Sequence, residues 1–232
     1  MSEALPGDPA SAGPKAPLYK NPWFWGVLFC LIFPPCIRPF TRHIPEPPAV
    51  SSQVASLELE RSGGGAFSRE DLTSKVQVVA FVDGSTEGCP ALVETLKPLT
   101  EKFDVQALAG RGFMARNAGF GDEIGVLVVV GFAEGAPVDL PGVETRCELA
   151  SERWTLVGGG MGRVLDFAAQ VQGVEPTGVT LLSHSRLAIV DQAAAVRGLY
   201  GSDRYGLDEV YNRSQHVLIE HRIALREAED DL

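Results

Sequence analysis

Cys89 is the residue best placed to carry chemistry. It follows an apolar run, Lys75–Val82, and a loop, Asp83–Pro90, and a helical pattern begins directly after it at Ala91. Because proline is favoured in the first turn of a helix, Pro90 places Cys89 at or near an N-cap. There the helix dipole and the free backbone N–H groups stabilise a thiolate. The position indicates either a reactive or metal-binding thiol, or a small apolar residue packed against a sheet.

His184 is the second candidate. It lies in a loop just before the apolar run Arg186–Asp191. A neutral imidazole in a loop can bind a soft metal beside a thiolate, whereas a loop histidine without such a neighbour is an ordinary surface residue. The pattern therefore makes His184 a metal ligand only if the fold brings it to Cys89. The remaining histidines, His43, His216 and His221, show no ligand spacing with one another, and His216 is interpreted as structural or exposed.

Other motifs carry little chemistry. The four cysteines contain no C-x-x-C and are too few for a disulfide scaffold, so Cys147 is interpreted as structural or exposed. The cluster Gly158–Arg163 fails the dinucleotide pattern because Arg163 stands at the third glycine position, which favours a tight strand-to-helix turn. The sequence has no P-loop, no nucleophile elbow and no paired catalytic carboxylates.

Composition and charge set the class of protein. Of 232 residues, 45% are hydrophobic and 22% are charged, which is typical of a globular chain. The formal net charge is −10, made of +2 over residues 1–43 and −12 over the remainder. An acidic body argues against nucleic acid as a partner, since phosphate contacts need clustered Lys and Arg.

The first fifty residues predict a membrane anchor. Residues 1–17 are rich in Pro, Ala, Gly and Ser and are expected to be disordered. Residues 18–37 hold a run of 16 uncharged residues, short for a bilayer that wants about 20, with Trp23 and Trp25 near one end as interfacial aromatics. A single-pass anchor is the prediction; a cleaved secretory signal and a buried helix of the folded domain stay open. Residues 38–52 form a Pro-rich linker that holds a domain away from the membrane.

Residues 53–226 alternate strand and helix patterns, and 227–232 form an acidic tail. Two nearly continuous apolar runs are typical of strands covered on both faces of a sheet. The predicted strands are Leu57–Glu60, Lys75–Val82, Ile124–Val130, Arg153–Val157, Arg186–Asp191 and Ala195–Tyr200; the predicted helices are a short turn at Ser68–Leu72, Ala91–Thr100 with a kink at Pro98, one through Val164–Ala168, and a terminal one from Leu207 to about Ala228. This order predicts an α/β, thioredoxin-like domain.

The stretch from Leu57 to about Val217 resembles the Sco/SenC family of membrane-anchored, thioredoxin-like copper proteins. The matching motifs are Gly84–Pro90, Glu152–Leu156, Ser183–Asp191 and Val196–Tyr200, in that order. The resemblance implies a thioredoxin-like fold and a role in assembling the copper centre of cytochrome c oxidase. A copper-bearing oxidase subunit or another copper protein would then be the partner. It also implies a protein of the cell membrane, with one span and a domain that faces the periplasm.

The same resemblance implies a copper site and a gap in it. The family binds copper through C-x-x-x-C-P and a distant histidine. On this chain Cys89 matches the second cysteine and His184 the histidine, while Ser85 stands at the first cysteine. Cu(I) is soft and favours two thiolates plus an imidazole, and a serine hydroxyl is a hard donor. The site is therefore incomplete, and no dithiol–disulfide cycle can run within the motif.

Three functions remain open on the sequence alone. The first is a divergent copper-handling assembly factor that uses Cys89 and His184. The second, which Ser85 favours, is a degenerate membrane-tethered interaction module that binds no metal. The third is a thiol peroxidase or reductase, because Thr86 and Cys89 fit the T-x-x-C spacing that places a hydroxyl beside a reactive thiolate.

Overall fold

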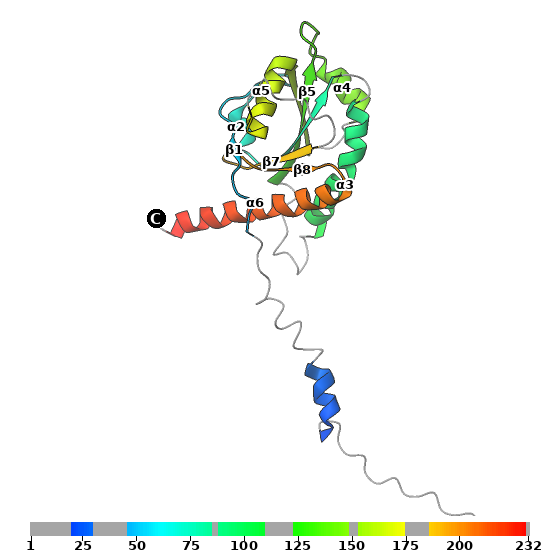
Figure 1. Cartoon of the computed structure of the whole chain (residues 1–232), viewed down its shortest axis with the longest axis vertical. Coiled ribbons are helices and arrows are strands. Elements are labelled where there is room, and N and C mark those ends of the chain that lie inside the picture. Colours follow the sequence, from blue (N-terminus) through cyan, green and yellow to red (C-terminus); the bar gives the residue numbers. More distant parts are fainter. Residues whose placement is uncertain are drawn as a thin grey trace, which may run out of the picture. The chain divides into compact units, whose positions relative to one another are not determined.

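The computed structural model describes residues 20–29, 46–84, 88–109, 123–148, 153–174 and 186–230, with the backbone alone at 88, 89 and 105–109. The chain divides into two compact units, Met1–Pro45 and Glu46–Leu232. Figure 1 shows the whole chain, coloured along the sequence.

The larger unit is built on one mixed sheet. Its described strands lie in the order β1-β8-β7-β4-β5-β6-β2-β3. The three central strands β4, β5 and β6 are parallel, and every outer pairing is antiparallel. The strands are β1 Ser52–Gln53, β2 Glu58–Arg61, β3 Ala66–Ser68, β4 Val76–Asp83, β5 Ile124–Phe132, β6 Trp154–Gly160, β7 Arg186–Val190 and β8 Ala195–Gly201.

Helices cover both faces of this sheet (Figure 1). Helices α3, α4 and α6 pack on one face and α5 packs on the other, with the short α2 beside it. The helices are α2 Arg69–Leu72, α3 Gly88–Ala109, α4 Leu140–Cys147, α5 Met161–Gln172 and α6 Arg204–Asp230. The C-terminal end of α6 projects past the sheet, and its residues beyond Arg222 are exposed.

The apolar strands feed two separate cores. In β4 the side chains of Val78 and Ala80 point into the core under α3 and α6, while Val79 and Phe81 point into the core under α5. Successive strand residues face opposite sides, so a strand that is buried on both sides must be apolar throughout. This is why Val76–Val82 and Ile124–Val130 have almost no polar residues. These two segments and Leu187–Val190 lie in one sheet, which confirms the prediction.

The N-terminal unit contains a helix over residues 22–29. Its aromatic residues Trp23, Trp25 and Phe29 are 77%, 56% and 57% exposed. Within the described ranges no helix combines the length and the apolar character needed to cross a bilayer. Half of the predicted anchor, residues 18–37, lies outside those ranges.

Two local predictions differ from the structure. Gly158, Gly159 and Gly160 were expected in a turn, but they are the last residues of β6, and α5 begins directly at Met161. The strand extends through the glycines because Gly158 pairs with Val130 of β5, and its missing side chain leaves room for Leu140 of α4. Helix α3 also begins at Gly88 rather than Ala91, and it continues through Pro98 to Ala109.

Candidate functional site

The parallel strands end together at one edge of the sheet. Strands β4, β5 and β6 finish at Asp83, Phe132 and Gly160, and ligands of open α/β sheets bind at this edge. An open hollow of about 410 Å³ lies there. It is lined mainly by apolar atoms, from Asp83, Gly84, Gly131, Phe132, Ala133, Ala136 and Met161.

The chain leaves β4 in close contact with β5. The Gly84 N–H donates to the Gly131 carbonyl oxygen at 2.7 Å. A Cβ at Gly84 would lie 3.0 Å from Cδ1 of Phe132 and 3.2 Å from that carbonyl oxygen, so the position has no room for a larger residue. Gly84 therefore fixes how the chain leaves β4 beside the end of β5.

Cys89 lies in the first turn of α3, one residue after the helix begins at Gly88. Its backbone position agrees with the expectation from Pro90, while its side chain lies outside the described residues. Ser85, Thr86 and His184 also lie outside them. The convergence of Cys89 and His184 on one site therefore stays a prediction.

The β7–β8 hairpin follows His184 by two residues and is braced at its turn. The buried carboxylate of Asp191 accepts hydrogen bonds from the backbone N–H groups of Ala193 and Ala195, each at 2.8 Å. Its second oxygen accepts from Nε of Arg197 at 2.6 Å. The turn that sets the direction of β7 thus depends on one buried carboxylate.

Arg197 extends that brace to two other parts of the unit. One Nη1 contacts Oε2 of Glu220 on α6 at 3.0 Å and donates to the carbonyl oxygen of Pro48 at 3.2 Å. The hairpin, the terminal helix and the chain that enters the sheet at β1 are therefore held by one guanidinium group. This group is 16% exposed.

Helix α3, which carries Cys89, is fixed at its other half. Nε and Nη2 of Arg153 donate to the same oxygen of Asp104 at 2.9 and 2.6 Å, and Nη1 donates to the backbone oxygen of Ile124. Lys102 also pairs with Asp208 of α6. Arg153 belongs to a motif that carries the family resemblance. Its contacts with Asp104 and Ile124 show that it positions α3 against the start of β5.

Cys147 differs from its sequence interpretation in one respect. It is buried, 3% exposed, as the last residue of α4. It is also disulfide-bonded. The four cysteines were judged too few for a disulfide scaffold, and that reasoning gave no sign of a single bridge. Cysteine spacing alone does not reveal a bond between distant elements.

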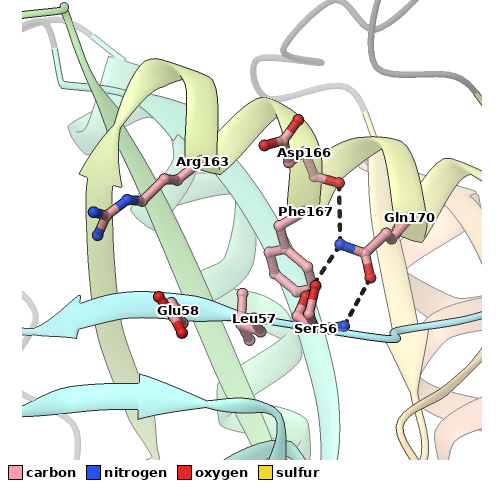
Figure 2. A pocket seen from close by; sticks show the side chains of 7 residues that line it. All are labelled: Ser56, Leu57, Glu58, Arg163, Asp166, Phe167 and Gln170. Carbon is pink, nitrogen blue, oxygen red and sulfur yellow. Dashed lines mark hydrogen bonds between the residues drawn. The ribbon is translucent and has the colours of Figure 1, made fainter.

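A second hollow, of about 220 Å³, lies on the opposite face of the sheet between α5 and the chain entering β2 (Figure 2). Gln170 bridges the two: its Oε1 accepts from the N–H of Ala55 at 2.8 Å and its Nε2 donates to the oxygen of Ser56 at 3.1 Å. Arg163 and Asp166 rise from α5 along its rim. The clamp of Gln170 on the chain gives this hollow a structural role.

The described residues contain no group of three or more His, Cys, Asp and Glu close enough to hold a metal ion. His216, on α6, is buried at Nδ1 without a hydrogen-bond partner there. Burial lowers the pKa of His216 below its ordinary value, and the Arg213 guanidinium lowers it further. A metal site with three or more such ligands would need at least one of them from outside the described residues.

Comparison with known proteins places the fold. No family model matches the sequence, and no curated protein matches it. Among solved structures, the chain shares a thioredoxin-like α/β fold with proteins of the Sco family, which confirms the Sco/SenC resemblance at the level of the fold.

Three of these structures are similar over nearly their whole length. BsSco, a Sco-family cytochrome c oxidase assembly protein with an identified disulfide switch, is 17% identical, with a TM-score of 0.51 over 75% of this chain and 98% of BsSco. A SCO1/SenC family lipoprotein from Bacillus anthracis is 14% identical, with a TM-score of 0.51 over 73% and 99%. Yeast Sco1 is 14% identical, with a TM-score of 0.50 over 75% and 96%.

Proposed function

We propose that the chain is a membrane-tethered, Sco-like protein that handles copper for the assembly of a respiratory oxidase copper centre, with Cys89 and His184 as its metal ligands. One observation carries the proposal. Cys89 lies in the first turn of the helix that follows central strand β4, whose last residue Asp83 lines an open apolar hollow, in a fold that Sco proteins share. Copper here is cargo that the protein passes on.

The donor set fits Cu(I) in part. A thiolate and an imidazole are both ligands that suit copper, and a helix N-terminus favours the thiolate form. Phe132, Ala133 and Met161 give the hollow at that edge a mainly apolar lining, which suits a soft ion better than a hydrated one. Ser85 remains a departure, because its hydroxyl cannot replace a second sulfur.

A copper titration tests this function. The reduced full-length chain, purified in detergent, is titrated with Cu(I) against a chromogenic chelator. We expect one equivalent to bind, with binding lost in Cys89→Ala and in His184→Ala, and unchanged in Cys30→Ala as the matched control. Ser85→Cys should tighten binding by restoring a second soft ligand in the motif. If the wild type binds no copper and Ser85→Cys gains none, the proposal fails and the non-metal interaction module replaces it.

We also propose one membrane span within residues 18–37, with the larger unit on the periplasmic side. The exposed Trp23 and Trp25 on the helix over residues 22–29 support it, since such aromatics sit at membrane interfaces. Protease added to intact spheroplasts should digest residues 46–232. Protection in intact spheroplasts with digestion after lysis would contradict this orientation.

A further inference from the structure

The disulfide bond at Cys147 leads to an inference about the site itself. Cys147 ends α4 and is 3% exposed. Along α4 it lies on the same stripe as Leu140 and Val143, spaced three and four residues apart, and all three are buried in the core under α3. Its sulfur forms a disulfide bond with another cysteine.

Helix α3 presents a matching stripe to the same core. Leu92, Leu96, Leu99 and Phe103 are each no more than 1% exposed and belong to the cluster that contains Cys147. These positions repeat at three- and four-residue intervals. Cys89 stands three residues before Leu92 on the same helix, so its backbone position falls in line with this stripe.

The number of cysteines in the larger unit leaves one candidate there for the partner of Cys147. The unit Glu46–Leu232 contains two cysteines, Cys89 and Cys147. The other two, Cys30 and Cys36, belong to the separate N-terminal unit. Helices α3 and α4 pack directly on one another, and both stripes face one core.

We propose that Cys147 is bonded to Cys89 and supplies the second sulfur that Ser85 does not. The inference rests on the proposed function and adds its regulation. In the oxidised protein the sulfur of Cys89 is part of the disulfide bond, so it is not a thiolate and cannot bind Cu(I). In the reduced protein Cys89 and Cys147 give two sulfur ligands from two different helices.

The redox step is a thiol–disulfide exchange. A dithiol reductant gives two electrons and two protons to the Cys89–Cys147 bond, which becomes two thiols, and the reductant becomes a disulfide. Oxidation is the reverse, with a protein or small-molecule disulfide as the electron acceptor. Cu(I) binding to the reduced pair then displaces thiol protons, as metal binding to cysteine does.

Peptide mapping of the unreduced full-length chain tests the pairing directly. Free thiols are alkylated during denaturation, so that buried thiols are labelled as well, and the protein is digested with trypsin. The sequence places Cys147 in peptide 147–153, Cys89 in peptide 76–102, and both Cys30 and Cys36 in peptide 21–42. We expect 147–153 joined to 76–102. A bond from 147–153 to 21–42, or an alkylated Cys147, overturns the inference.

Copper binding measured with and without reduction distinguishes a failure of the Cys89–Cys147 pairing from a failure of the proposed copper-handling function. The wild type should bind Cu(I) only after reduction. Cys147→Ala should bind with or without reduction, at least tenfold more weakly than the reduced wild type; Cys30→Ala is the control. If binding needs Cys89 but reduction has no effect, the inference fails and the proposed function stands. A mapped Cys89–Cys147 bond with no copper binding overturns the function and leaves the pairing.

Discussion

Replacing Arg197 by methionine should be among the most damaging single changes in the larger unit. The substitution keeps an unbranched apolar stem in place of the aliphatic part of the side chain and removes the cation that faces Asp191. That carboxylate is 5% exposed, and the Arg197 side chain is 16% exposed, so solvent screens the pair only weakly. Removing one partner of a buried ion pair leaves a buried charge uncompensated, which costs about 3–5 kcal/mol.

The structure places the expected loss at the lower end of that range, about 3 kcal/mol, because one oxygen of Asp191 keeps the N–H groups of Ala193 and Ala195 after the substitution. Glu220→Gln is the matched control. It removes a contact to the same guanidinium, but Glu220 is 41% exposed, so the loss should stay below about 1 kcal/mol.

Urea denaturation of residues 46–232, followed by tryptophan fluorescence and circular dichroism, measures both effects. The slope of free energy against urea should be the same in all variants, so that midpoints report stability alone. A double variant with Asp191→Asn should lose less than the sum of the single losses, since the two groups interact. If Arg197→Met costs less than about 1 kcal/mol, Asp191 is solvated in a way that contradicts its burial, and the reasoning fails.

Three further predictions concern other positions. Gly158→Ala should cost about 1–3 kcal/mol in urea denaturation, because its Cβ would lie 2.7 Å from a backbone carbonyl oxygen of β5, whereas Gly160→Ala, with no atom within 4 Å, should cost almost nothing; equal losses would refute this. The pKa of His216 is lowered in the folded protein, so the unfolded chain binds more protons, and the free energy of unfolding should fall as the pH drops from 7.5 through the ordinary pKa of about 6.5. His216→Gln should flatten that fall, and an unchanged slope would contradict the assignment. Gln170→Ala should speed amide exchange at Ala55 and cost about 1–2 kcal/mol, since it leaves that N–H without its acceptor; unchanged exchange would argue against the clamp.

The central sheet could be predicted from sequence because its strands are buried on both faces. The runs at Val76 and Ile124 allow no other arrangement at their length, and the turn between Arg186 and Tyr200 is marked by two apolar runs around a short polar segment. The capped turn at Ser68 was also predictable, since Ser68 and Asp71 form the reciprocal pattern of a capping box.

The ends of elements were less predictable because tertiary contacts decide them. Gly158 has the composition of a loop, but its lack of a side chain lets Leu140 of α4 pack against β6, so the strand continues through it. Helix α3 continues past Pro98 to Ala109, beyond its predicted end at Thr100, and buried leucines on both sides of Pro98 hold it against the sheet.

The candidate site was predictable only in its first half. Cys89 could be placed at a helix start from Pro90 alone, and the structure has it in the first turn of α3. Cys147 could not be connected with any site, because 58 positions separate it from Cys89 and only the packing of α3 on α4 brings the two helices that carry them together. The spacing of residues in the sequence predicts which side chains are neighbours within one helix or strand. It does not predict which residues of two different helices come into contact.

The strands at the two ends of the described sheet limit how another protein can bind by adding a strand. Strand β1 has two residues and β3 has three, so each margin offers few unpaired main-chain groups. A long open margin invites strand addition by another chain and promotes aggregation. Margins this short disfavour strand addition, whether by another protein or by a second copy of this chain. A protein that binds this unit would then contact its helix surfaces or its loops.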